Sequence, residues 1–146
     1  MDTSDFAFFL EQYHQALDEI INGRPELYQS LYSRSDDATL ANPFAPFGPV
    51  SRGCAQVSET IARAAANYTC GRVLGFENFS TVLTPELGYF VEVERFEATV
   101  RGRDEASVLA LRVTTILRRE NAVWKVVHRQ ADPITVPRSA ASLLGE

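Results

Sequence analysis

The sequence lacks any apolar run that could cross a membrane. Its 146 residues are 45% hydrophobic, but no uninterrupted apolar stretch approaches the ~20 residues that a bilayer requires. The first five residues, Met1 to Asp5, are acidic, and they lack the basic region with which a secretory signal begins. We therefore expect a soluble, cytoplasmic protein that does not associate with membranes.

Clusters of basic residues are also lacking. The chain has 14 lysines and arginines against 19 aspartates and glutamates, which gives a formal net charge of −5. Binding to a phosphate backbone requires a concentrated basic surface, because counterion release supplies most of the affinity. The densest basic segments, Arg118-Arg119 and residues 101–103, are typical of solvated turns. We expect no nucleic-acid partner.

Cysteine and histidine are scarce, with two of each. Cys54 and Cys70 flank a predicted helix that would hold them ~24 Å apart, beyond the ~7 Å that a disulfide allows, and free thiols are typical of a reducing compartment. A metal site needs three or four converging ligands, which His14 and His128 do not supply. Glycine-rich phosphate loops and a Gly-x-Ser-x-Gly motif are absent too, so we predict neither a metal nor a cofactor.

Three helices are predicted before a run of strands. Apolar residues recur at helical spacing from Phe6 to Ile21, and Gly23 provides a left-handed stop. Pro25 is placed for the first turn of a short second helix that reaches Tyr32. A third helix is expected over residues 54–68, where apolar side chains again share one face.

The strand pattern predicts an α+β fold. A short strand is expected over 36–42, and four more are expected over 72–83, 88–101, 106–118 and 122–132. The short breaks between the last four strands require antiparallel pairing. Helices gathered on one face of a curved antiparallel sheet would form a cone, whereas a doubly wound parallel fold needs helices between the late strands. We expect one domain over residues 1–134 and a C-terminal tail, an extension or partner-contacting arm, over 135–146.

Several segments resemble a known family. They are Leu111–Thr114, Trp124–Asp132, and Asp36–Leu40 followed by a proline- and phenylalanine-rich loop and Arg52-Gly53. Over about residues 6–134 the chain resembles SnoaL-like proteins of the NTF2-like superfamily. The resemblance implies a cone with a ligand cavity at its open end and homodimers that pair through the sheet. Members include isomerases, cyclases and epoxide hydrolases, and others that only bind or scaffold. Relatives often carry a second histidine where Gln130 stands here, so a two-histidine relay would be incomplete.

Strand alternation suggests a polar row across the sheet. If residues 102–104 and 119–121 form the two loops, Glu94 lies opposite Arg112, and Arg112 lies opposite His128. A one-residue slip would bring another arginine opposite Arg112, and like charges in that position are destabilising. We therefore predict the row Glu94–Arg112–His128 and expect it to face the interior.

Each member of this row has a candidate role. His128 titrates near neutrality and is a candidate acid–base group, and Glu94 is the alternative base. Arg112 could hold a substrate carboxylate or enolate. The other predicted ligand-binding residues are Phe90, Thr114, Trp124 and Gln130 on the same face, and Asp37, Asn42 and Phe44 around the mouth of the cone.

Three functions remain open at this stage. The first is a pocket protein that binds a small, partly apolar ligand carrying an anionic or carbonyl group. The second is a cofactor-free isomerase, cyclase or hydratase that uses His128 or Glu94. The third is a dimeric interaction module without a functional pocket. Two alternatives to a functional row are a row on the outer surface or in a dimer interface, and a purely structural Glu94–Arg112 ion pair in the interior.

Overall fold

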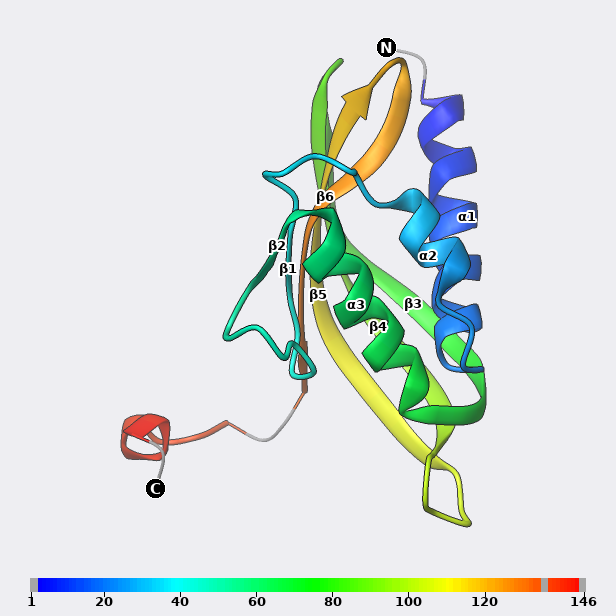
Figure 1. Ribbon diagram of the computed structural model, residues 1–146, viewed down its shortest axis with the longest axis vertical. Helices are drawn as coiled ribbons and strands as arrows, with labels where there is room; N and C mark the ends of the chain where they lie inside the picture. Colours follow the sequence, from blue (N-terminus) through cyan, green and yellow to red (C-terminus); the bar gives the residue numbers. More distant parts are fainter. Residues whose placement is uncertain (1–2, 135–136, 145–146) are drawn as a thin grey trace.

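The computed structural model describes residues 3–134 and 137–144, which form three helices and a six-stranded sheet, with a short 3₁₀ helix near the end (Figure 1). The elements are α1 (Ser4–Ile20), α2 (Glu26–Leu31), β1 (Thr39–Ala41), β2 (Ser51–Arg52), α3 (Gly53–Ala66), β3 (Tyr68–Leu83), β4 (Leu87–Val100), β5 (Ser107–Glu120), β6 (Val123–Pro133) and η1 (Ala140–Leu144). The predicted tail includes residues 135–136 and 145–146, which lie outside the described ranges.

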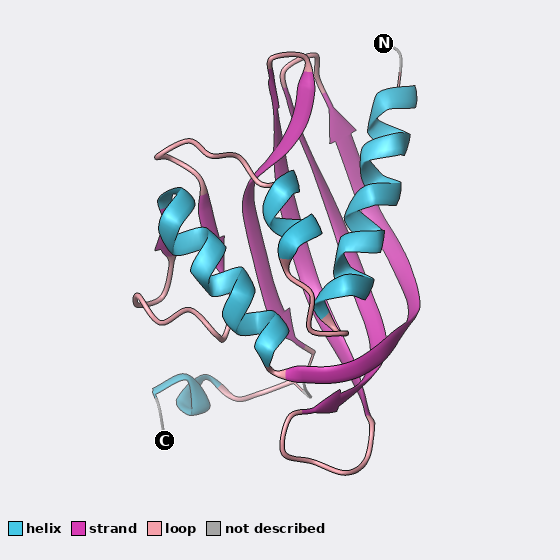
Figure 2. Cartoon of the chain, turned by 45° about the vertical axis from the view of Figure 1, so that its right-hand side comes forward, coloured by secondary structure: helices cyan, strands magenta, loops and turns pink. Residues whose placement is uncertain are grey.

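The sheet has the order β2-β1-β6-β5-β4-β3, and its four long strands form an antiparallel ladder. The short β1 runs parallel to β6 and extends the sheet at the other edge. All three helices lie on one face of the curved sheet (Figure 2). The predicted α+β cone is confirmed. Within the described ranges, no helix is long and apolar enough to cross a membrane.

Aromatic side chains fill the space between α1 and the sheet. Phe6, Phe9 and Tyr13 follow the apolar stripe of α1 and are buried. The Tyr13 ring meets Phe90 of β4 edge to face at 5.2 Å, and Tyr28 of α2 lies 5.6 Å from Tyr13. Because these rings pack against one another, they fix the position of α1 and α2 over the strands.

The predicted register of β4 and β5 is wrong by one residue. Val93, not Glu94, lies opposite Arg112, and Glu94 lies opposite Leu111. This register puts the even-numbered side chains of β4 and the odd-numbered side chains of β5 on the inner face, so that Val113 and Leu117 are buried. Burial of these apolar side chains turns Arg112 outward, since a one-residue slip reverses the faces of a strand.

The predicted register of β5 and β6 is also wrong. Arg112 lies opposite Asp132, and His128 lies opposite Ile116. Two features cause the difference: the hairpin turns on only two residues, 121 and 122, and a bulge near Ile116 gives β6 an extra residue at Val127. A bulge changes which side chains face inward, and here it turns Arg129 into the core.

Candidate functional site

A cavity of about 310 Å³ lies between the helices and the inner face of the sheet. Its walls are largely apolar and come from α1, α2, α3 and five of the strands, with Phe44 from the loop after β1. The volume is at the lower end of the range for small-molecule sites, ~300–1,000 Å³. Polar side chains are few, and the buried ones are Tyr28, Tyr68, Glu94 and Arg129.

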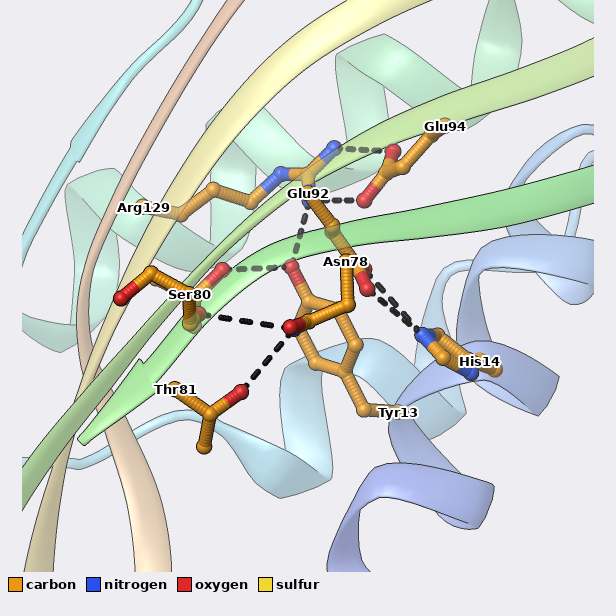
Figure 3. A network of polar contacts seen from close by, with 9 residues as sticks. Tyr13, His14, Asn78, Ser80, Thr81, Glu92, Glu94 and Arg129 are labelled. Carbon is orange, nitrogen blue, oxygen red and sulfur yellow. Dashed lines mark hydrogen bonds and ion pairs between the residues drawn. The ribbon is translucent and has the colours of Figure 1, made fainter. Parts of the chain in front are cut away.

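Arg129 and Glu94 form a buried ion pair in the cavity wall. Nη1 of Arg129 donates to one carboxylate oxygen of Glu94 at 2.7 Å, and Nη2 donates to the other at 2.9 Å (Figure 3). Their side chains are only 9% and 4% exposed. Burial alone would lower the pKa of Arg129, but the adjacent Glu94 carboxylate and nearby tyrosines raise it well above its usual value. The guanidinium therefore keeps its charge.

Tyr13 connects this pair to β5. Nη1 of Arg129 also donates to the Tyr13 hydroxyl at 2.5 Å, which leaves the hydroxyl proton free to be donated to Oγ1 of Thr115 at 2.8 Å. Burial raises the pKa of Tyr13 well above its usual value, despite the opposing effect of Arg129. The phenol therefore stays protonated and holds the guanidinium in place.

Tyr28 is the exception in this network. Its side chain is 3% exposed, and its hydroxyl has no hydrogen-bond partner in the part of the chain that the structure describes. Burial raises the pKa of Tyr28 to about 12, although Arg129 and Tyr13 are close enough to oppose that rise. The hydroxyl oxygen is itself fully buried beside Tyr13 and Arg129, so it belongs to this polar network and not to the open surface of the cavity.

A second buried carboxylate, Glu92, lies two residues before Glu94 on the same face of β4. Nε2 of His14 lies 3.1 Å from both Glu92 oxygens, and Figure 3 shows this pair near the Arg129–Glu94 pair. The His14 ring stacks on Phe76 of β3, with 3.6 Å between centroids and 5° between planes. Phe76 itself lines the cavity, so the pair supports one of its walls.

Solved structures show which fold this is. No family model matches the chain, and no curated protein is similar to it in sequence. A proposed dehydratase of the NTF2-like family from Streptomyces avermitilis superimposes with a TM-score of 0.73 at 16% identity, over 92% of this chain and 98% of that one. An NTF2-like superfamily protein from Salmonella enterica serovar Typhimurium gives 0.74 at 14% identity, over 94% and 96%. A ketosteroid isomerase-like protein from Erwinia carotovora atroseptica gives 0.70 at 14% identity, over 88% and 93%.

The chain has the NTF2-like fold. The fold implied by its resemblance to SnoaL-like proteins is thereby confirmed. In the chain's NTF2-like cone, the cavity described above lies between the helical layer and the concave side of the sheet.

Three of the predicted site residues line this NTF2-like cavity: Glu94, Asn42 and Phe44. Asn42 uses its side-chain oxygen to accept a hydrogen bond from the backbone N–H of Phe44 at 2.9 Å, which stabilises the loop at the mouth. Phe90 and Trp124 are buried core residues, 0% and 4% exposed, outside the cavity lining.

His128 and Arg112 lie apart from Glu94. His128 is half-buried, and its Nδ1 is 2.7 Å from Oγ1 of Thr39 on β1. Burial lowers the pKa of His128 below its usual value. Arg112 is on the outer face, 66% exposed, and pairs with Asp132. The predicted row of three residues is therefore not formed.

The remaining predicted residues also face away from the cavity. Thr114 borders a shallow hollow on the outer face of the sheet, and Gln130 is exposed next to it on β6. Asp37 pairs with Arg118 at the end of the sheet, and this hydrogen-bonded pairing lowers the pKa of Asp37 and raises that of Arg118.

Sequence reasoning missed Arg129, Tyr28 and the His14–Glu92 pair as site residues. In the expected register, Arg129 is one of the arginines that a one-residue slip would place opposite Arg112. The missing signal was charge balance: Glu94 needs a buried cation, and Arg129 becomes that cation once a bulge is placed in β6. Tyr28 gave no pattern that separates it from the neighbouring core aromatics.

Proposed function

We propose that the chain binds a small, partly apolar molecule carrying a carbonyl or anionic group in the cavity of its NTF2-like cone. One observation carries this proposal: a largely apolar cavity of about 310 Å³ has the buried Arg129–Glu94 pair in its wall. Apolar walls supply affinity for a ring or chain, and a few fixed polar groups orient it. Asn42 and Phe44 are proposed rim contacts.

Binding without catalysis is favoured over acid–base chemistry by the hydrogen bonds of the candidate groups. Both oxygens of Glu94 already accept hydrogen bonds from Arg129, and His128 bonds to Thr39 outside the cavity lining. The second candidate is a cofactor-free isomerase, cyclase or hydratase that uses Glu94. The position of Glu94 in the cavity wall favours it, and two structures of this fold are described as a proposed dehydratase and as ketosteroid isomerase-like.

A cavity-filling variant tests the proposed function. Ala64 is half-buried on the inner side of α3 and lines the cavity, so Ala64→Phe should occupy part of its volume. Screening small ketones, alcohols and carboxylates by thermal shift should give compounds that raise the melting temperature of the parent protein and not of this variant. Glu94→Gln removes the charge that pairs with Arg129, so this variant should melt at a lower temperature, but its folded fraction should retain binding. Turnover of a bound compound by the parent protein that is lost in folded Glu94→Gln would favour the enzyme. A library that stabilises neither protein would contradict the proposal.

We also propose that two copies pair through the outer face of the sheet. Val82, Leu87 and Tyr89 are large, exposed and adjacent at one end of that face, and an exposed apolar patch is typical of an interface. In analytical ultracentrifugation, Tyr89→Lys should dissociate the dimer. The control is Phe8→Lys at an exposed position of α1, and it should leave the dimer intact. A parent protein that is monomeric would contradict the proposed pairing.

We also propose a cytoplasmic location, and the two free cysteines support it.

A further inference from the structure

The C-terminal segment, residues 137–144, carries apolar side chains that the rest of the chain leaves uncovered. Its helix η1 lies against no other helix or strand of the described ranges, and Figure 1 shows it apart from the domain. Leu143 and Leu144 are 79% and 75% exposed, more than any other large hydrophobic side chain in those ranges. Removal of such side chains from water is favourable, so we expect this segment to bind an apolar surface.

The outer face of the sheet offers a surface of matching chemistry. A shallow hollow of about 290 Å³ lies there, at the end of the sheet where the chain turns from β3 into β4. Its apolar walls are Val82, Leu87, Tyr89 and Ile116, and no charged residue of the described ranges lines it. Leucine side chains fit such a surface, whereas a charged segment would lose its hydration there without gaining a partner.

The direction of β6 points the tail of each copy away from its own hollow. Ile116, in the wall of the hollow, pairs with His128 near the start of β6, whereas Leu111 pairs with Pro133 at its end. β6 therefore runs away from the hollow, and the tail leaves the sheet at the opposite end (Figure 1). To reach the hollow of its own copy, the tail would have to reverse its direction and cross the outer face.

A second copy that pairs through the outer face supplies a tail in the required direction. Identical copies usually pair with two-fold symmetry. If the axis runs across the strands, the strands of the two facing sheets are antiparallel, so β6 of each copy ends toward the hollow of the other. The ten residues from Ile134 to Leu143 span up to ~33 Å when extended. The tail is therefore long enough to cross the hollow of the other copy.

We propose that two copies exchange their C-terminal segments, with Leu143 and Leu144 of each copy seated in the outer-face hollow of the other. This inference rests on the proposed pairing through the sheet and goes beyond it, because it identifies the segment that covers the hollow. Symmetry produces the contact twice in each dimer, so a substitution in the segment removes two contacts.

Sedimentation of two matched variants tests the exchange. Leu143→Asp/Leu144→Asp should raise the Kd of the dimer at least tenfold and leave the circular dichroism spectrum unchanged. The control Ser139→Asp/Ala140→Asp adds the same charge to exposed positions of the same segment and should keep the parent Kd. If the leucine variant keeps the parent Kd, or if both variants raise it equally, the inference fails and the pairing stands. If the parent is monomeric, both fail.

Disulfide formation identifies which copy supplies the segment. In a chain with Cys54→Ser and Cys70→Ser, one protein receives Leu87→Cys and a second, larger by a fusion tag, receives Leu143→Cys. Oxidation of the mixture should link the two proteins, because bridged Cα atoms lie within ~7 Å of each other. The control replaces Leu87→Cys by Phe8→Cys on the helical side and should give no link.

A single chain that carries both Leu87→Cys and Leu143→Cys should form disulfide-linked dimers. An internal disulfide in a chain of monomer size would show that the tail covers the hollow of its own copy, which would overturn the exchange. The exchange is also overturned if no disulfide forms, or if Phe8→Cys links as readily as Leu87→Cys.

Discussion

The guanidinium of Arg129 on β6 reaches across β5 to bind both carboxylate oxygens of Glu94 on β4. Thr115 lies directly opposite Arg129 on the intervening strand, and it is hydrogen-bonded to Tyr13 of α1. Three strands and one helix therefore meet at a single buried polar group. Apolar packing cannot provide this connection, because the residues are joined by directional hydrogen bonds.

Breaking this pair from one side should destabilise the fold strongly. Arg129→Met leaves the Glu94 carboxylate buried without its cation, and loss of one partner of a buried pair costs about 3–5 kcal/mol. Urea unfolding should therefore show a much lower midpoint. The double variant Arg129→Met/Glu94→Leu removes both charges and should recover most of that loss.

The matched control for this prediction is Arg112→Met on the neighbouring strand. Arg112 makes a similar two-point pair with Asp132, but the side chains are 66% and 46% exposed. Exposed pairs contribute less than about 1 kcal/mol. Equal losses in the Arg129 and Arg112 variants would contradict the importance of burial.

Removing His14 should destabilise the fold, because among the described residues His14 is the side-chain hydrogen-bond partner of the buried Glu92. His14→Phe retains a ring that can stack on Phe76 but removes the donor to both Glu92 oxygens. The expected loss is about 2 kcal/mol, in the range for hydrogen bonds to charged groups. In a double-mutant cycle with Glu92→Leu, the two losses should be less than additive. Additive losses would show that the two residues do not interact in solution.

The sequence was sufficient to predict the fold, because that prediction needs only the order and periodicity of the elements. The helical stripe that begins at Phe6 and the antiparallel strands appear as expected. Prediction of the candidate site also required the register of the strands, and that register depends on single residues in turns. The last pair of the β4–β5 ladder is Ala98 with Ser107, so residues 99–106 separate the paired positions where only 102–104 were expected, and Glu94 comes to lie opposite Leu111 instead of Arg112.

Local charge repulsion was a poor guide to pairing for a physical reason. The prediction compared cross-strand pairs worth ~0.2–1 kcal/mol each, whereas burial of a single Val or Leu contributes ~1.5–3 kcal/mol. The observed register buries Val113 and Leu117. It places Arg112 on the outer face, where its guanidinium pairs with Asp132. The bulge that places Arg129 inside has no marker in the sequence that the alternation rule could have used.

Acid should weaken the fold partly through His128. Burial lowers its pKa in the folded state below the ordinary value of 6.5, so the unfolded chain takes up this proton at a higher pH than the folded chain does. Stability from this residue is therefore fully present above pH 6.5, and it is lost as the pH falls toward the lowered pKa. The free energy of unfolding should rise with pH through this interval in the parent protein.

The His128→Gln variant should make that pH dependence shallower below pH 6.5. Nuclear magnetic resonance titration of the parent should give a His128 midpoint below 6.5, with the two histidine signals assigned by comparison with His128→Gln. A midpoint at or above 6.5, or an unchanged slope of stability against pH in the variant, would contradict the prediction.

The turn that sets the register of β5 and β6 is strained at a residue that can be replaced. Asn121 and Ala122 both have positive φ values, 52° and 65°, the pattern of a tight two-residue hairpin turn that favours Asn-Gly. Alanine adopts this conformation at a cost that glycine avoids. Ala122→Gly should therefore stabilise the protein by about 1 kcal/mol, measured as a higher urea midpoint with an unchanged slope. As a control, Ala62→Gly in the middle of α3 should destabilise it by about the same amount. If both changes destabilise the protein, then the two-residue turn is not the native one, and the register that brings Arg129 to Glu94 must be reconsidered.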